Sequence, residues 1–211
     1  MNPARVLALL HCFLFAVLVQ SASISSLTNP APTFKEAVER TKTLVEKILK
    51  DLPAVHAATV TIEGLTLDPS NQSTYLEMMA KLLGIPTAPV IKQLSENFTL
   101  DMCVSRMLAG GQLYQRLLGV LSGKVSGLDD LKVDLRDLLL RVSKLKEAAQ
   151  LGSGDTSDQN GSLDLASRLP GNYEVQVAVH LTLSQLRSFC HDLIRSLRAI
   201  ATYRFQGAGA Q

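Results

Sequence analysis

Apolar residues recur at alternating steps of three and four over four long stretches of the chain: 33–52, 90–122, 128–150 and 174–204. Because an α-helix completes a turn in about 3.6 residues, this spacing gathers apolar side chains on one helix face. The spacing is most regular in the third stretch, at Leu128, Leu131, Leu135, Leu138, Val142 and Leu145. One helix cannot bury such a face alone, so the pattern predicts an all-α protein whose helices cover one another.

The last stretch contains two different patterns. Its second half has the helical spacing, at Leu183, Leu186, Cys190, Leu193, Leu197 and Ile200. Residues 174–183 instead alternate between apolar and other side chains, as a strand does. A strand needs a partner, and the other strand-like segment, 58–67, is interrupted by Gly64. We therefore expect helix over 174–183, with strand as the alternative.

Capping and breaking residues set the expected ends of the shorter elements. Thr33, followed three residues later by Glu36, is a capping box at the start of the first helix. Pro53 should end that helix, because proline cannot donate a backbone hydrogen bond. A short helix is expected over 74–83, closed by Gly84.

The lengths of the connections predict how the four long helices are ordered. The loop 123–127 is short, so the helices 90–122 and 128–150 should be antiparallel neighbours. The connections before the second and the fourth helix are long enough to cross the molecule. This order is a long-chain four-helix bundle, up-up-down-down with two crossover loops. The second crossover, 151–170, is a polar, flexible linker with almost nothing to bury. Gly110-Gly111 predicts that a neighbouring helix approaches the second helix closely.

The first 23 residues have the pattern of a secretory signal peptide. Arg5 precedes an apolar run from Val6 to Val19, and small residues follow it. The run is shorter than the roughly 20 residues that span a bilayer, although a signal anchor is the alternative. We expect residues 24–211 to form one secreted, extracellular domain. Its N-glycosylation sequons, at Asn71, Asn97 and Asn160, suit a secreted glycoprotein.

The balance of charges argues against two classes of partner. The chain has 21 Lys and Arg residues against 19 Asp and Glu residues, without a basic cluster. A nearly neutral surface favours neither nucleic acid nor an anionic membrane. We therefore expect no nucleic-acid binding and no membrane insertion.

Residue patterns typical of catalysis or metal binding do not occur in the sequence. There is no HExxH, no CxxC and no Glu-x-x-His pair. His56, His180 and His191 are far apart in sequence, and we expect the last two at the surface or at the edge of the bundle. The segment Gly119–Lys124 is one residue short of a P-loop and follows a helix, where a P-loop follows a strand. We expect no enzyme, no cofactor and no metal.

Three segments resemble one family of cytokines. Leu83-Gly-Ile-Pro-Thr-Ala-Pro89 resembles the LGIPxAP motif of the granulocyte colony-stimulating factor family, in the interleukin-six-like superfamily. Residues 128–137 are similar to the third helix of that family and residues 184–189 to the fourth. The resemblance covers about 83–204. It implies a secreted haematopoietic growth factor of the immune response. Such a factor binds and dimerises a class I cytokine receptor to signal proliferation and differentiation of granulocyte-lineage cells.

The resemblance also implies two receptor-binding patches. The first, on the first and third helices, would bind the cytokine-homology module of the receptor ectodomain. Its residues here are Glu39, Lys42, Asp134 and Asp137. The second, on the first crossover and the start of the fourth helix, would bind an immunoglobulin-like domain of another receptor chain. Tyr173 matches its aromatic position; Tyr75 stands where the family has an acid, and Glu77 is the nearest carboxylate.

Two cysteines follow the signal segment, Cys103 and Cys190. Cys103 matches a half-cystine of the family, but Gln93 stands at the usual partner position, which leaves Cys190. On antiparallel helices the two residues would differ in height by roughly 9 Å, more than the Cα separation of about 7 Å that a disulfide tolerates. A Cys103–Cys190 disulfide is thus the less favoured alternative to a core thiol at Cys190 with Cys103 free or in an intermolecular bond.

A secreted lipid carrier built from amphipathic helices, as in exchangeable apolipoproteins, is the alternative function. Such carriers have proline at regular intervals between their helices. Proline is absent from 90–169 and from 171–211, which favours a fixed bundle.

Overall fold

The computed structural model describes residues 33–67, 74–152 and 164–202, all within one compact unit, Pro32–Gln211. The described residues form five α-helices and contain no strand, so the prediction of an all-α protein is confirmed. The helices are α2 (Phe34–Thr59), α3 (Thr74–Leu83), α4 (Leu100–Leu121), α5 (Asp129–Ala148) and α6 (Asn172–Thr202). The expected signal peptide, residues 1–23, lies outside the described residues.

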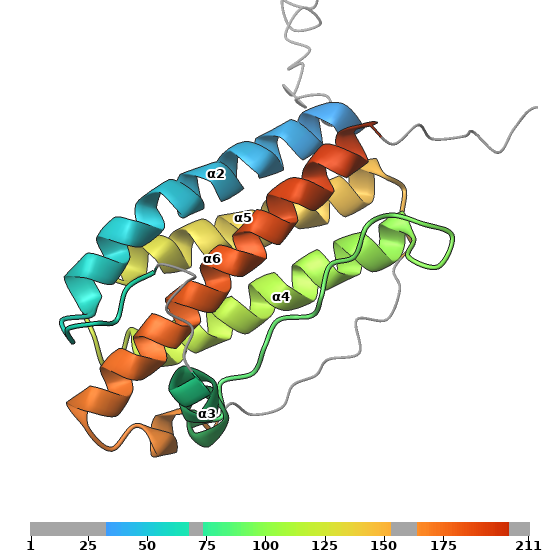
Figure 1. Ribbon diagram of the computed structural model, residues 1–211. Coiled ribbons are helices and arrows are strands. Elements are labelled where there is room, and N and C mark those ends of the chain that lie inside the picture. The colour runs from blue at the N-terminus through green and yellow to red at the C-terminus, as the bar shows by residue number, and fades with distance from the viewer. Residues whose placement is uncertain (1–32, 68–73, 153–163, 203–211) are drawn as a thin grey trace, which may run out of the picture. The chain divides into compact units, whose positions relative to one another are not determined.

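The four long helices pack side by side around a common apolar core (Figure 1). α2 packs against α5 and α6, and α4 packs against the same two helices. The short helix α3 packs against α6. Every apolar position expected on the face of 128–150 is buried, as are the six expected on the second half of α6. The three–four spacing therefore identified the buried faces of both helices correctly.

α2 begins as expected but continues beyond its expected end. The Thr33 hydroxyl accepts a hydrogen bond from the Glu36 backbone N–H, at 3.3 Å. The helix then passes through Pro53 and ends at Thr59, so an end at residue 52 is wrong. Proline removes one donor from the helix, at a cost of about 3 kcal/mol. Hydrogen bonds of His56 to His180 and of the Thr59 hydroxyl to the Val55 carbonyl, in the two following turns, oppose that cost. The strand expected as an alternative from residue 58 is absent.

α4 begins ten residues later than expected. Residues 90–99 form an irregular segment, in which Ser95 and Phe98 exchange two backbone hydrogen bonds of 3.1 Å. The Thr99 hydroxyl then caps α4 by accepting from the Met102 backbone N–H. The backbone N–H groups in the first turn of a helix have no acceptor within the helix. A threonine hydroxyl that accepts from one of them therefore marks a helix start. Phe98 is buried and fixes the preceding turn against the core.

The first half of α6 is helical, which confirms helix over strand for 174–183. Every residue from Val175 to Leu183 is buried, including the polar residues Gln176, His180 and Thr182. A helix buried on all sides needs no amphipathic spacing. The alternating valines therefore belong to a fully buried helix segment, and their spacing does not indicate a strand here.

The connection before α6 buries more apolar side chains than expected. Leu165 and Leu169 are buried on either side of a 3₁₀ turn, Ala166–Arg168, so the expectation that 151–170 has almost nothing to bury is wrong. The part of the linker from 153 to 163, with Asn160, lies outside the described residues, as does Asn71.

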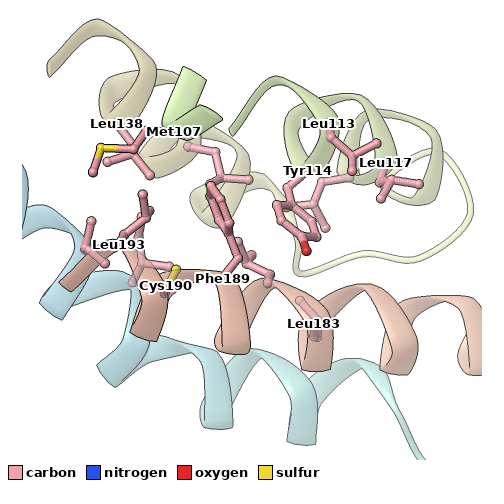
Figure 2. Close-up of a cluster of buried hydrophobic side chains, with 14 of the residues drawn as sticks. Met107, Leu113, Tyr114, Leu117, Leu138, Leu183, Phe189, Cys190 and Leu193 are labelled. Atoms are coloured by element: carbon pink, nitrogen blue, oxygen red, sulfur yellow. The ribbon is translucent and has the colours of Figure 1, made fainter. Parts of the chain in front are cut away.

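Gly110-Gly111 marks a close approach between helices, as predicted. A Cβ atom at Gly110 would lie 2.4 Å from two ring atoms of Phe189 on α6. One at Gly111 would lie 2.8 Å from the Leu139 side chain on α5. Phe189 stands between α6 and α4, beside Tyr114 (Figure 2).

Candidate functional site

The two carboxylates expected on α5 have different surroundings. Asp134 accepts a short hydrogen bond from the Lys47 ammonium of α2, and its side chain is only 13% exposed. Lys47 also contacts Asp51, at 3.2 Å. The hydrogen bond to Asp134 is the main cause that raises the pKa of Lys47. Asp134 therefore joins α5 to α2 and is largely covered.

Asp137 is exposed and lines a groove between α2 and α5. The groove has a volume of about 300 Å³, and Ala37 and Arg40 of α2 form one side of it. Leu140 forms part of the other side and is 55% exposed. An exposed apolar side chain next to charged groups is the arrangement that protein interfaces use at their centres.

The remaining candidates on α2 lie outside this groove. The Lys42 ammonium and the Glu39 carboxylate form an ion pair with each other, at 3.0 Å. Arg40 and Leu140, which do line the groove, were not among the sequence-based candidates. Leu140 carried a readable signal, because it is a large apolar residue between the core positions Leu138 and Val142.

A second surface joins α3 to the start of α6. The hydroxyl oxygens of Tyr75 and Tyr173 are 2.9 Å apart and share a hydrogen bond, although the residues are 98 positions apart in sequence. This hydrogen bond is the first cause of a raised pKa at Tyr173. The two side chains are 46% and 47% exposed. Of the sequence-based candidates here, Glu77 is exposed on the same helix, α3.

α3 has two parallel apolar stripes. Leu76, Met79 and Leu83 are buried, whereas Met78 and Leu82 are 55% and 64% exposed. The exposed stripe begins at Tyr75, one turn before Met78. A surface of exposed apolar residues with polar edges is typical of a protein-binding site. We call Tyr75, Met78, Leu82 and Tyr173 the α3–α6 surface.

One buried polar residue of α6, His180, does not lie where the sequence pattern predicts. His180 is 3% exposed and lies in the core, so a position at the surface or edge is wrong. Its Nδ1 is 2.9 Å from Nε2 of His56, in the last turns of α2. Burial, with a smaller effect of His56, lowers the pKa of His180 to about 4, and burial lowers that of His56. His191 is exposed.

The two cysteines are free and buried. Burial raises the pKa of Cys103 to about 11 and that of Cys190 to about 12. Because the thiolate is the reactive form, neither side chain is suited to nucleophilic catalysis or to exchange at neutral pH.

A larger trough lies between residues 90–101 and the second half of α6, with a volume of about 1680 Å³. Its charged lining includes Asp101, Lys92 and an ion pair between Asp192 and Arg195. None of the sequence-based receptor-site residues lies in it.

The described parts of the chain offer no ready metal centre or membrane span. Within 33–67, 74–152 and 164–202, no three His, Cys, Asp or Glu residues are grouped to hold a metal ion. No helix in these ranges has the length and apolar character needed to cross a bilayer. Comparison of the sequence with known proteins finds no matching family model and no matching curated protein.

Proposed function

We propose that this protein is a secreted haematopoietic cytokine related to the granulocyte colony-stimulating factor family. It binds and dimerises a class I cytokine receptor, and it is not an enzyme. The observation that carries the proposal is the α3–α6 surface. Tyr173, expected at one receptor patch from resemblance, and Tyr75, which stands where the family has an acid, share a hydrogen bond on an exposed apolar surface.

Receptor dimerisation needs two separate binding surfaces on one molecule. The groove at Asp137 includes the first turns of α2, whereas α3 lies near the opposite end of the long helices (Figure 1). Two surfaces so placed can contact two receptor chains at the same time, which supports the cross-linking role. The groove would take the cytokine-homology module, and the α3–α6 surface the immunoglobulin-like domain.

The proposed topology is the up-up-down-down bundle of long-chain cytokines. Figure 1 supports it, because α2 and α4 run in one direction and α5 and α6 in the other. The connection between α2 and α4 includes α3, and that between α5 and α6 includes the 3₁₀ turn. In this topology both long connections are crossovers.

Burial of the helix faces argues against the lipid carrier. The apolar faces of the four long helices cover one another in one continuous core. A carrier needs its apolar faces free for lipid, whereas exposure here is concentrated at a few side chains such as Leu82 and Leu140.

The proposal is tested by measuring the binding of residues 24–211 to a panel of class I cytokine receptor ectodomains. Asp137→Ala with Leu140→Ala should weaken binding to the cytokine-homology module about tenfold, or about 1.4 kcal/mol. Tyr75→Ala with Tyr173→Ala should abolish dimerisation while leaving that first contact intact. Asp130→Ala, an exposed acid at the start of α5, is the matched control.

Two results would contradict the proposal. One is wild-type binding and wild-type cell proliferation by both double variants, with circular dichroism showing that they are folded. The other is a strong rise of helicity when phospholipid vesicles are added, which would favour the lipid carrier.

A further inference from the structure

Three side chains of α6 hold the chain that leaves α2. His180 pairs with His56, which lies three residues after Pro53 in α2. Gln176, one turn before His180, accepts hydrogen bonds from the Thr61 backbone N–H, at 2.8 Å, and from the Thr61 hydroxyl, at 3.1 Å. Arg187 donates to the Leu67 carbonyl further along. The segment 60–67, which leads towards α3, is thus fixed to α6 at several points.

The hydrogen bond of the histidine pair depends on the protonation state of both rings. A neutral imidazole donates from one nitrogen and accepts at the other. One added proton still leaves an acceptor between His56 and His180. A second proton removes it, because a protonated imidazole only donates. Two cations would then face each other 2.9 Å apart in the core.

No neighbouring carboxylate offsets these charges. The pKa of His180 responds to burial and to His56, and that of His56 to burial alone. The acids closest in sequence on the packed elements are Asp51 on α2, Glu63 after α2, Asp129 at the start of α5 and Glu174 on α6. None of them contributes to either pKa shift. Gln176 and Thr59, the other polar residues nearby, carry no charge.

We propose that the His56–His180 pair is an acid-sensitive latch, which holds segment 60–67 on α6 at neutral pH and loosens it progressively as the pH falls from 7 towards 4. Protonation of the pair expels His56 from α6 and weakens the hydrogen bonds of Thr61 to Gln176. The freed segment loosens α3, and with it the contact between Tyr75 and Tyr173. If the proposed function holds, acidification therefore weakens binding through the α3–α6 surface before the bundle unfolds.

Hydrogen exchange measured by mass spectrometry at pH 7, 6 and 5 tests the latch on the mature chain without any receptor. After correction for the intrinsic effect of pH, peptides covering 57–67 should exchange at least about tenfold faster at pH 5 than at pH 7. Peptides from α4 and α5 should change by less than about twofold. Uniform acceleration throughout the bundle would overturn the proposal, and so would unchanged exchange at 57–67.

Variants separate the latch from other effects of acid. His56→Leu with His180→Leu removes the titrating pair, and it should make exchange at 57–67 independent of pH. His191→Leu removes an exposed histidine and should behave as the wild type. The same acceleration in the double variant as in the wild type would overturn the proposal.

Direct titration of the histidines by nuclear magnetic resonance covers the case in which the double variant does not fold. His56 and His180 of the wild type should titrate below 6.5, the ordinary value for histidine. Titration of both near 6.5 would overturn the latch. These measurements do not involve a receptor, whereas failure of receptor binding at pH 7 would contradict the proposed function alone.

Discussion

Replacement of Gly110 by alanine tests the closest helix contact of the core. The new Cβ would lie 2.4 Å from Cε2 and Cζ of Phe189, and 3.3 Å from its Cδ2. Unstrained carbon atoms do not approach so closely, so the ring or a helix must move. Phe189 is 3% exposed, and its ring packs on Tyr114 with centroids 5.3 Å apart. A displaced ring would therefore disturb further buried side chains.

Two opposing effects set the size of the change. Alanine favours a helix interior over glycine by about 1 kcal/mol. Overpacking of a closed core costs about 1–3 kcal/mol. Because the contact falls on two atoms of a confined ring, we expect the cost near the upper end of that range. Gly110→Ala should lower the free energy of unfolding by about 1–2 kcal/mol, and the melting temperature by roughly 4 °C.

Gly119 provides the matched control in the same helix. It is exposed, and a Cβ atom there would meet nothing within 4 Å. Gly119→Ala therefore keeps the gain in helix propensity without the clash, and should stabilise the protein by up to about 1 kcal/mol. The two substitutions are chemically identical, so the difference between them measures the packing of Phe189.

Urea unfolding gives the free energy of unfolding of both variants. It is followed by circular dichroism at 222 nm, where the signal comes from helical peptide groups. A third variant, Phe189→Leu combined with Gly110→Ala, should be less destabilised than the sum of its two single substitutions, because the smaller side chain vacates the contact. If Gly110→Ala is as stable as Gly119→Ala, the close approach of α4 and α6 at this point is refuted.

Three further predictions concern a helix cap, the thiols and the dependence on pH. In urea unfolding, Thr99→Ala should lower the free energy of unfolding of the unglycosylated protein by about 1 kcal/mol, because it removes the cap of α4. Asn97→Gln also removes the sequon but keeps the cap, and it should change that free energy by less than about 0.5 kcal/mol. Cys103 and Cys190 should stay unmodified by a thiol reagent in the folded chain and react fully in denaturant; rapid reaction of the folded chain would contradict their burial. The free energy of unfolding should fall by about 2 kcal/mol from pH 7 to pH 5, because the unfolded chain takes up a proton below about 6.5, whereas folded His180 does so only near 4. His180→Gln should reduce this fall, and an unchanged fall would contradict the assignment.

The apolar spacing predicted the buried faces of the helices better than it predicted their ends. A face is repeated over many turns, so a single exceptional residue does not hide it. An end depends on one or two residues in competition. Pro53 failed to end α2 because one face of the next two turns, at His56 and Thr59, is buried, and Thr99 began α4 because its hydroxyl caps the first turn. Those outcomes depend on tertiary packing and on capping geometry, which periodicity does not contain.

The two candidate surfaces differ in how far the sequence could reveal them. Resemblance singled out Tyr173, and it marked Tyr75 as a departure from the family. That their hydroxyls meet depends on the packing of α3 on α6, which no local pattern encodes. The sequence predicted only part of the lining of the groove between α2 and α5. Leu140 was visible as an apolar residue off the core face, but Arg40 has no distinguishing local signal.

Asp134 and Asp137 show why the type and spacing of residues cannot by themselves assign a binding role. They lie three residues apart on one helix, and resemblance treats them as a pair. Lys47 of α2 forms an ion pair with Asp134, whereas Asp137 is exposed beside Leu140. A partner that used Asp134 would have to break an ion pair and desolvate a second charge, at a cost that one new contact barely offsets. Asp137 has no such intramolecular ion pair among the described residues. Asp137→Ala should therefore weaken receptor binding more than Asp134→Ala, while Asp134→Ala should reduce stability more. Equal losses of binding would refute this division of roles.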